Sequence, residues 1–595
     1  MIERMDKVTL LVSEKDRERF VSGLRRAGVL HIKRIKEPVS HDIKFVEDRI
    51  ARIERMIGSL EPYSGEREGI GGPDICDDER LLEEESRVTE EAAEKERLAS
   101  DMAEIERQLF WFKEWGGFDP EELKALKEKG IDLRLFRIPG SKLGEIDEKL
   151  QTRVIRTTKQ YSLMAVMADG QETVPGDEEE PPARSPEALL RLKQAKEDRV
   201  KEIDRDLAIK ADWLEKIKKC KNSLEKEKEF QQVKHGMEGQ GRFAYLQGYC
   251  PERSFGKVKE LAEKENAGYM REEADDTQDV PTLVTNPKWI EIIKPVFSFM
   301  NTVPGYGEFD ISGVFLVFFS LFFAMLVGDA GYGLIFVLVT FLARKKAPKA
   351  PPQPFFLMYL MGASTVIWGA ITGTWFGSET IAQLPGFRAL VVSKISSFGD
   401  TQDFLIYFCF VIGAIQLTIA HVMKFVREMN SPRAVAQIGW IAIVWGMFFA
   451  AGTLVVKKPF PPAGGWLLAA GVLLVLVFNE FQKNVLKGMG STLTNLPLNV
   501  IGAFSDVVSY LRLFAVGYAS VVLAQTFNGM ALGGGVKGVM GGVAAAFILF
   551  LGHTLNIVLA LMAVIVHGIR LNMLEFSANH MGMQWAGKEY EPFRE

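Results

Sequence analysis

The hydrophobic pattern divides the chain into two unlike halves. Up to about residue 286, apolar positions are mixed with dense Lys, Arg, Glu and Asp, whereas from Gly313 onward long apolar runs are separated by short polar or Pro- and Gly-containing breaks. The first half therefore predicts a water-exposed structure and the second a membrane-embedded one. We expect a cytoplasmic arm over residues 1–290 and an α-helical, polytopic membrane domain over residues 291–595.

The first half predicts two α/β lobes joined by a coiled coil. Residues 1–35 have the pattern of a strand, a helix from Ser13 to Gly28, and a second strand. Residues 42–115 and 188–235 are rich in helix formers and in charges of both signs. Because two long polar helices cannot each bury a full face, they predict an antiparallel coiled coil. The α/β patterns at 116–170 and 242–271 predict the lobes.

Eight apolar runs in the second half are candidates for membrane-spanning helices. They lie at about 310–328, 330–344, 354–374, 403–426, 434–456, 464–482, 498–527 and 541–573. The first two could also form one long helix, since only GDAGYG separates them. With a cytoplasmic N-terminus, nine Lys and Arg residues between the runs fall inside and five outside. Cytoplasmic loops favour these residues, so we predict a multi-pass protein of the cell membrane with both termini in the cytoplasm.

Composition and motifs exclude several functions. The net charge is −5, and no basic cluster alternates with aromatic residues, so we expect no nucleic-acid partner. Cys76, Cys220, Cys250 and Cys409 show no CxxC or CxxH spacing, so we expect neither a metal site nor a disulfide framework. The first residues form no long apolar run, so we expect no cleaved signal peptide. Without GxxxxGK[ST], HExxH or GxSxG motifs, we expect no cofactor and no enzymatic activity by this chain alone.

Two arginines fall inside the apolar runs, where an ionisable side chain is costly and indicates function. Arg512 lies about midway along the seventh run, and Arg570 lies toward the end of the eighth. Arg570 could extend its head to the lipid headgroups, but Arg512 cannot comfortably reach either membrane surface. An ion pair with another span, for instance through Glu480, is the structural alternative for Arg512. Asp506 lies on a different helix face, so we do not expect it to neutralise Arg512.

Small and polar residues recur around both arginines at helical spacing. Small residues allow another helix to approach closely, and they include Ser505, Ser509, Ala515, Ala519, Ala560 and Ala563. The polar residues that could line water-filled ion paths are His567, Asn556, His553, Asp506, Glu480 and Gln525. The histidines at 553 and 567 could equally be core residues bonded to backbone carbonyls.

Five segments resemble subunit a of vacuolar ATPases, called subunit I in archaeal and bacterial A/V-type ATP synthases. They are VPGYGEFD (303–310), LVGDAGYG (326–333), IWGAITGTWFG (367–377), SYLRLFAVG (509–517) and HGIRLNMLEF (567–576). The resemblance implies an arm of two lobes joined by a coiled coil, and eight membrane helices of which the last two face a rotor. The family's essential arginine falls on Arg512 and its second membrane arginine on Arg570. Eukaryotic members carry histidine at Ser520 and glutamate at Ala560, so the chain is more similar to the archaeal and bacterial type.

This resemblance implies a membrane stator that couples proton or sodium movement to rotation. Each subunit of a proteolipid ring (c or K subunits) would carry a carboxylic acid that is neutral in lipid. Near Arg512 the carboxylate form is favoured and the proton leaves, while the fixed cation separates two aqueous half-channels. Arginine suits this role because it stays protonated. Further implied partners are peripheral stalk subunits of the E/G or H type on the arm, and a central-stalk cap subunit near the membrane.

Two other function classes compete with this hypothesis. A self-contained secondary transporter with a cytoplasmic regulatory domain often shows an internal repeat around a midplane site. No convincing repeat relates the first four apolar runs to the last four. A purely structural tether leaves Arg512 and its small neighbours without a reason.

Overall fold

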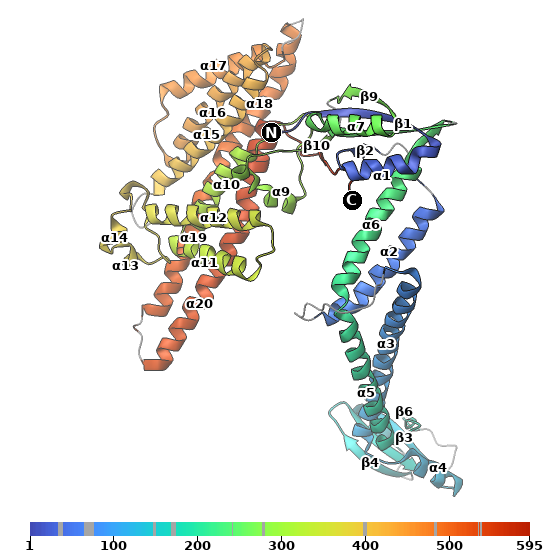
Figure 1. Ribbon diagram of the computed structural model, residues 1–595. Coiled ribbons are helices and arrows are strands. Elements are labelled where there is room, and N and C mark those ends of the chain that lie inside the picture. Colours follow the sequence, from blue (N-terminus) through green and yellow to red (C-terminus); the bar gives the residue numbers. More distant parts are fainter. Residues whose placement is uncertain are drawn as a thin grey trace. The chain divides into compact units, whose positions relative to one another are not determined.

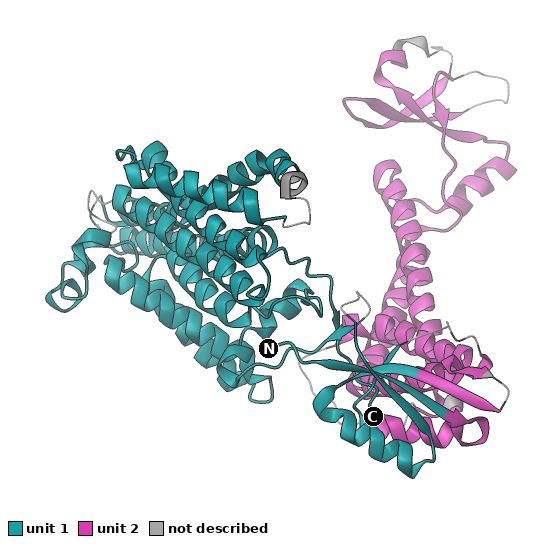
Figure 2. Cartoon of the chain, turned by 90° about the horizontal axis from the view of Figure 1, so that it is seen from above, with its two compact units in different colours: residues 1–11, 27–33, 247–594 teal, residues 12–26, 34–246, 595 magenta. Residues whose placement is uncertain are grey.

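The computed structural model describes residues 1–33, 38, 40–64, 76–146, 150–167, 174–240, 242–275, 280–396, 402–480, 485–533, 535 and 538–595. They divide into two units, residues 1–11, 27–33 and 247–594, and residues 12–26, 34–246 and 595 (Figure 2). This division differs from the expected boundary at residue 290, because strands from both ends of the first 275 residues pair in one sheet. The expected division into a cytoplasmic arm and a membrane domain at residue 290 stays a prediction.

Long antiparallel helices dominate the second unit. The chain runs out through α2 (His41–Leu60) and α3 (Asp78–Trp115) and returns through α5 (Pro186–Ala211) and α6 (Leu214–Gly236). Helix α2 packs on α6, and α3 packs on α5 (Figure 1). These helices occupy the two segments expected to form the coiled coil, and their shared core includes the fully buried Ile53, Met56 and Ile217.

A four-stranded antiparallel sheet lies at the end of these helices. Its strands are β3 (Leu133–Pro139), β4 (Gln151–Thr157), β5 (Tyr161–Met167) and β6 (Asp177–Glu178), in the order β4-β5-β3-β6, and α4 (Pro120–Glu128) precedes them. Side chains alternate between two cores along β3 and β5: Leu135 packs with Trp115 on one face, while Phe136 packs with Met164 on the other. We call this element the distal lobe.

Most of the other sheet belongs to the first unit, while residues 12–26 and 238–246 of the same region belong to the second. Strands β1 (Met5–Ser13), β2 (His31–Lys33), β8 (Phe243–Pro251) and β9 (Gly268–Glu273) follow the order β2-β8-β1-β9, and β7 (Glu238–Gln240) pairs with β8. Helix α1 (Arg17–Ala27) follows β1, and α7 (Phe255–Lys264) connects β8 to β9. The tail of the chain returns here: β11 (Lys588–Glu589) pairs with β10 (Pro281–Thr282), and the Phe593 N–H donates to the Leu30 carbonyl at 2.9 Å.

The structure pairs two cysteines that we expected to be free. Cys76, just before α3, forms a disulfide with Cys220 of α6, with 5.7 Å between their Cα atoms. The expectation of no disulfide is therefore wrong for this pair. Their separation of 144 positions carries no spacing signal, because only the antiparallel return of the helices brings them together. Cys250 and Cys409 are buried thiols, and burial raises the pKa of Cys250 to about 12.

The rest of the first unit is a helical bundle. After the short α8 (Lys288–Glu291) and α9 (Lys294–Met300), its helices are α10 (Ser312–Val327), α11 (Ala330–Lys346), α12 (Pro352–Thr372), α13 (Glu379–Ala382), α14 (Pro385–Arg388), α15 (Gln402–Arg427), α16 (Arg433–Val456), α17 (Pro462–Phe478), α18 (Val485–Ser509), α19 (Leu511–Leu532) and α20 (Gly538–Ala563). The last helix continues as π-helix through Val564–Gly568 and Leu571–His580. Helix α10 is buried along most of its length and contributes many residues to the core of the bundle.

All eight candidate runs contain a helix, but fewer than eight have the length and composition of a span. Within the described residues, five helices qualify, or six if α10 and α11 together form one span. These two helices meet at a 119° bend at Gly328 and Asp329, and α17 has only 17 residues. The difference arises because α10, α11 and α17 have 16, 17 and 17 residues, whereas a span needs about 20.

Candidate functional site

Arg512 pairs with a carboxylate that the sequence analysis did not single out. Its Nη2 donates to Glu575 Oε1, and its Nε donates to the Ser509 carbonyl at 3.0 Å. The Glu575 side chain is 3% exposed, and that of Arg512 is 23% exposed. Glu480, the partner considered from sequence, lies in the turn after α17 instead. A charge buried to this degree is tolerated when it is paired.

Arg570 shares the same carboxylate. Its Nε lies 3.7 Å from Glu575 Oε1, and its side chain is 57% exposed. In an α-helix, residues five apart point about 140° from each other, whereas the i→i+5 bonding of a π-helix stacks them. The π-helical stretch from Leu571 therefore brings Glu575 beneath Arg570. These three side chains, the arginine trio, carry two positive charges and one negative charge, a net charge of +1.

Two buried atoms near the trio lack partners. Among the described residues, Glu575 Oε2 and His567 Nδ1 are enclosed without a hydrogen bond. Leaving a buried polar atom unpaired costs about 1–3 kcal/mol. Such atoms are expected where a ligand, an ion or a partner side chain completes a site.

A buried network holds the backbone beside Arg512. Tyr510, between α18 and α19, donates its hydroxyl to Gln416 Oε1 at 2.8 Å, and Gln416 Nε2 donates to Asn572 Oδ1 at 2.9 Å. All three side chains are fully buried. Gly413 leaves room for the Tyr510 ring, since a Cβ there would lie 2.5 Å from it. The network positions Arg512 by fixing the residue two places before it.

A chain of hydrogen bonds, the inner cluster, starts at Asp506. Its Oδ2 lies 3.1 Å from His580 Nε2, and His580 Nδ1 lies 2.9 Å from His421 Nε2. His421 Nδ1 lies 2.9 Å from Gln437 Oε1, and Gln437 Nε2 donates to Glu428 Oε2 at 3.3 Å. The first four side chains are buried, and Glu428 lies between α15 and α16. The sequence predicted only Asp506 of this cluster. The other members could have been found because each is a polar residue within or beside an apolar run.

A second group, the outer cluster, lies farther along α19 and α20. The Tyr332 hydroxyl lies 2.7 Å from His553 Nδ1 and accepts from Asn556 Nδ2 at 3.0 Å. His553 Nε2 lies 3.1 Å from Asn528 Oδ1, and Ser520 donates to Asn556 Oδ1 at 3.1 Å. The structure thus joins the predicted His553 and Asn556 and adds three residues. Arg512 lies along the chain between Asp506 and Ser520, hence between the two clusters.

A buried aspartate joins two of the motif segments. Asp329 Oδ1 accepts from the N–H groups of Gly331 at 2.8 Å and Phe376 at 2.9 Å, and its Oδ2 accepts from Gly377 N–H at 2.9 Å. The side chain therefore caps α11 and ties it to the loop after α12. This explains LVGDAGYG and IWGAITGTWFG as one structural unit that positions Tyr332.

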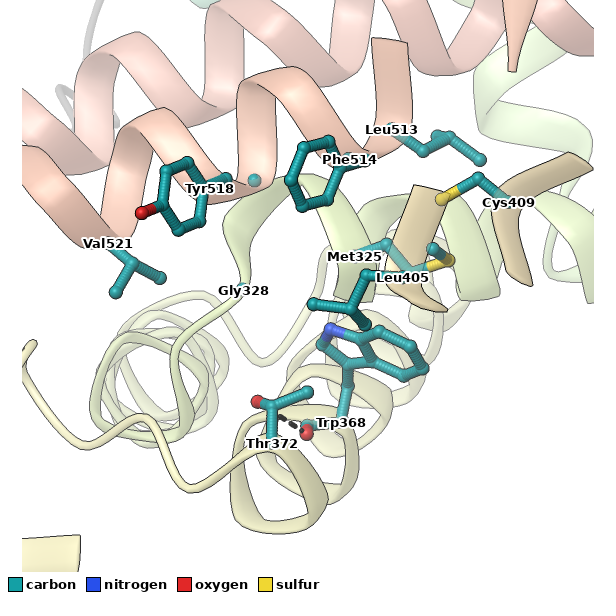
Figure 3. A pocket seen from close by; sticks show the side chains of 11 residues that line it. Met325, Gly328, Trp368, Thr372, Leu405, Cys409, Leu513, Phe514, Tyr518 and Val521 are labelled. Atoms are coloured by element: carbon teal, nitrogen blue, oxygen red, sulfur yellow. Dashed lines mark hydrogen bonds between the residues drawn. The ribbon is translucent and has the colours of Figure 1, made fainter. Parts of the chain in front are cut away.

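One face of α19 is occupied inside the chain. A cavity of about 40 Å³ lies on this face, lined by Phe514, Gly517 and Tyr518 and by residues of α10, α12 and α15. Figure 3 shows Phe514 and Tyr518 on the side of this cavity opposite Trp368. A Cβ at Gly517 would lie 2.3 Å from the Met325 carbonyl oxygen, so the backbones of α19 and α10 are in close contact. This face is not available to a partner.

The remaining predicted residues are distributed as follows. Ser505, Ala515 and Ala519 are exposed, Ser509 and Ala563 are half-buried, and Ala560 is buried. Gln525 is half-buried on α19 and, like Glu480, takes part in neither cluster among the described residues. Within the same ranges, no group of three or more His, Cys, Asp or Glu is placed to hold a metal ion.

Comparison with known proteins identifies the family. The chain is 30% identical over its whole length to V-type ATP synthase subunit I 1 of Treponema pallidum, covering 100% of that protein, and 30% identical to V-type ATP synthase subunit I of Borreliella burgdorferi, covering 99%. It is 27% identical to A-type ATP synthase subunit I of Methanocaldococcus jannaschii, over 80% of this chain and 73% of that one. No family model matches. A crystal structure of the cytoplasmic N-terminal domain of subunit I, homolog of subunit a, of V-ATPase aligns with 45% of this chain at 14% identity and a TM-score of 0.23, too distant to establish a shared fold. By the full-length similarity, the chain belongs to the subunit I family of V-type and A-type ATP synthases.

Proposed function

We propose that this chain is the membrane stator of a rotary ATPase, which supplies two ion half-channels and presents Arg512 to a passing rotor ring. The observation that carries the proposal is the charge balance of the arginine trio. Two arginines share one buried carboxylate, which leaves a positive charge in surplus among apolar helices. An unbalanced charge in a bilayer is costly unless a partner of opposite sign arrives.

The partner is a carboxylate on each rotor subunit. While it faces lipid, the acid is neutral, because an isolated carboxylate there is strongly disfavoured. Beside Arg512 the ionised form is favoured and the proton is released. A guanidinium keeps its charge throughout, whereas a lysine could lose it on burial. The same cation repels protons that would otherwise cross between the two half-channels.

The two clusters supply the half-channels. In the proposed eight-span topology, the inner cluster opens to the cytoplasm, because Glu428 lies in a loop next to Lys424 and Arg427. The outer cluster then faces the opposite side. Side chains that both donate and accept hydrogen bonds, such as His421 and His580, can pass a proton by exchanging partners. Sodium coupling would require other ligands on the rotor.

The rotor ring covers the open face of α19 and α20. In the most apolar 18-residue stretch of Gly538–His580 only 22% is buried, against 56% in the corresponding stretch of α15. Ser505, Ala515 and Ala519 expose small side chains on the same two-helix element as Arg512, which supports a close approach by another helix. Ala560 is buried, so we leave it out of this surface.

Catalysis of ATP synthesis or hydrolysis belongs to other subunits in this proposal. The arm binds peripheral stalk subunits, a central-stalk cap subunit lies near the membrane, and both termini are cytoplasmic in the cell membrane. The arm thereby prevents the membrane half from turning with the ring.

The test is ATP-driven ion pumping by the assembled complex in vesicles. Arg512→Ala and Arg512→Lys are each expected to abolish pumping while the complex still assembles, and Lys394→Ala in the exposed segment before α15 should pump like the wild type. Unchanged pumping in the Arg512 variants would refute the proposal. The isolated chain in vesicles should move no ions; sustained transport by it alone would favour the secondary transporter instead.

A further inference from the structure

An open crevice lies beside the first membrane helix, away from the arginine trio and both clusters. It has a volume of about 690 Å³ and is formed by α8, α10 and α12. Its walls are almost entirely apolar and are made by Trp289, Ile292, Leu316, Val317, Phe356 and Leu360, with Ser320 as the one small polar residue. The Ser320 hydroxyl already donates to the Leu316 carbonyl at 2.7 Å, so its proton is not available to a polar ligand.

The charge at this crevice has one sign. Among the described residues that line it, Lys288 is the only one with a charged side chain. The Arg344 guanidinium lies over the ring of Phe356, another lining residue, 5.0 Å from the ring centre. Glu291, on the same short helix as Lys288, lines a different cavity. An apolar volume thus lies next to two cations without a carboxylate among its lining residues.

The position along the chain suits the membrane boundary. The crevice lies where α8 precedes the first membrane helix and where α12 begins after the basic turn that follows α11. Trp289, Val317 and Phe356 are all exposed, at 62%, 58% and 47%. An exposed tryptophan beside lysine and arginine is typical of the interface between headgroups and acyl chains.

We propose that this crevice binds one anionic phospholipid, with an acyl chain along the apolar walls and the phosphate between Lys288 and Arg344. The volume lies within the range of ordinary ligand pockets. Basic pockets between membrane helices on the cytoplasmic side select anionic headgroups. A zwitterionic headgroup leaves one of the two cations unbalanced, so the crevice discriminates by net charge. The bound lipid fills the space between α8 and α12 and stabilises the junction where the arm enters the membrane.

The experiment uses quenching of Trp289 fluorescence by brominated acyl chains. The full complex is placed in phosphatidylcholine nanodiscs that contain a small fraction of either brominated phosphatidylglycerol or brominated phosphatidylcholine. Because the chain has ten tryptophans, each protein is measured with and without Trp289→Phe, and the difference reports this side chain. We expect quenching by the anionic lipid to be at least about fivefold more effective, the factor that one basic residue near the surface provides.

Variants separate the headgroup contribution from that of the acyl chain. Lys288→Gln with Arg344→Gln should remove the preference for the anionic lipid, whereas Arg388→Gln with Lys394→Gln, an equal charge change at exposed positions elsewhere, should keep it. Val317→Phe narrows the crevice without altering charge, and should reduce quenching by both lipids. Equal quenching by the two lipids in the wild type, an unchanged preference in the double variant, or no Trp289 quenching at all would each overturn the proposal. Pumping by Arg512 variants is a separate readout, so failure here leaves the stator proposal intact.

Discussion

Two arginines in this chain form ion pairs with opposite charge balance. In the distal lobe, Arg137 has two carboxylates: its Nε donates to Glu179 Oε1, and its Nη2 donates to Glu114 Oε2 at 3.0 Å. The guanidinium also lies 4.3 Å from the centre of the Tyr161 ring. In the membrane half, Arg512 shares the single carboxylate of Glu575 with a second arginine.

The difference shows how the same side chain is used for structure or for function. Around Arg137 every charge has further partners, since the indole N–H of Trp111 and that of Trp115 also donate to Glu179 Oε2, at 2.8 and 2.9 Å. The site is closed, and its surplus charge is negative in a water-exposed lobe, where it costs little. Around Arg512 the surplus is positive, and the pair at its centre is largely enclosed, with Arg512 23% and Glu575 3% exposed. An arginine whose charge is matched by carboxylates stabilises a fold, whereas a buried arginine with a surplus of positive charge beside it can bind another carboxylate.

Removal of the shared carboxylate should have the largest effect. Glu575→Gln leaves two arginines without a counter-charge, and loss of one partner of a buried pair costs about 3–5 kcal/mol. We expect a loss of that order in the free energy of unfolding, measured by denaturant titration of the purified chain in detergent, together with loss of pumping. Glu575→Gln combined with Arg570→Gln restores the net charge of +1 and should recover part of the stability. A single variant as stable as the wild type would contradict the trio.

Overpacking beside Tyr510 should have the second-largest effect on pumping. Gly413→Ala places a methyl group 2.5 Å from the Tyr510 ring, and such overpacking typically costs about 1–3 kcal/mol. Because Tyr510 fixes the backbone next to Arg512, pumping per assembled complex should fall too. Gly502→Ala is the matched control: a Cβ there meets nothing within 4 Å. Equal behaviour of the two variants would show that the Tyr510 network does not position Arg512.

The distal-lobe arginine should affect stability but not transport. Arg137→Gln removes hydrogen bonds to two carboxylates, each worth roughly 1.5–3 kcal/mol when a charged group takes part. Hydrogen exchange of the β3 and β5 amides in the full chain should accelerate, while pumping per assembled complex stays constant. Arg107→Gln removes an exposed pair with Glu104 and should change neither. Reduced pumping in assembled Arg137→Gln complexes would mean that the distal lobe is not purely structural.

The smallest expected effect is that of acid on the distal lobe: low pH should destabilise it, while neutral pH should not. The Tyr161 hydroxyl, with Arg137, lowers the pKa of Glu114. For Glu179, burial raises the pKa, but Arg137 and the two tryptophans outweigh it and the pKa is lowered. A carboxylate whose pKa is lower in the folded state adds stability above its ordinary pKa of about 4.3, and this stability is lost as the pH falls through the folded value. Amide protection of β3 and β5 should therefore be constant above about pH 5 and decline below about pH 4. In Arg137→Gln the decline should begin at higher pH; an identical pH profile would argue against the pair.

The sequence predicted what depends on local pattern. A charged residue within an apolar run singled out Arg512 and Arg570, and alternating and helical periods located the lobes and the long polar helices. Glu575 was missed because its five-residue distance from Arg570 lies off any α-helical face, and only the π-helical stretch aligns the two. His421 and His580 were missed because their partners come from separate helices. The count of eight spans stays a prediction, because length and composition identify five helices among the described residues, or six with α10 and α11 as one span.

The return of the tail to the first sheet constrains how the protein is made. Residues 588–593, which pair with β10 and with Leu30, are translated after every membrane helix. Phe593 is 1% exposed, so its site near Leu30 stays open until then. The sheet region that the ribosome begins first is thus among the last to be completed, because its final contacts come from residues that are synthesised after the whole bundle.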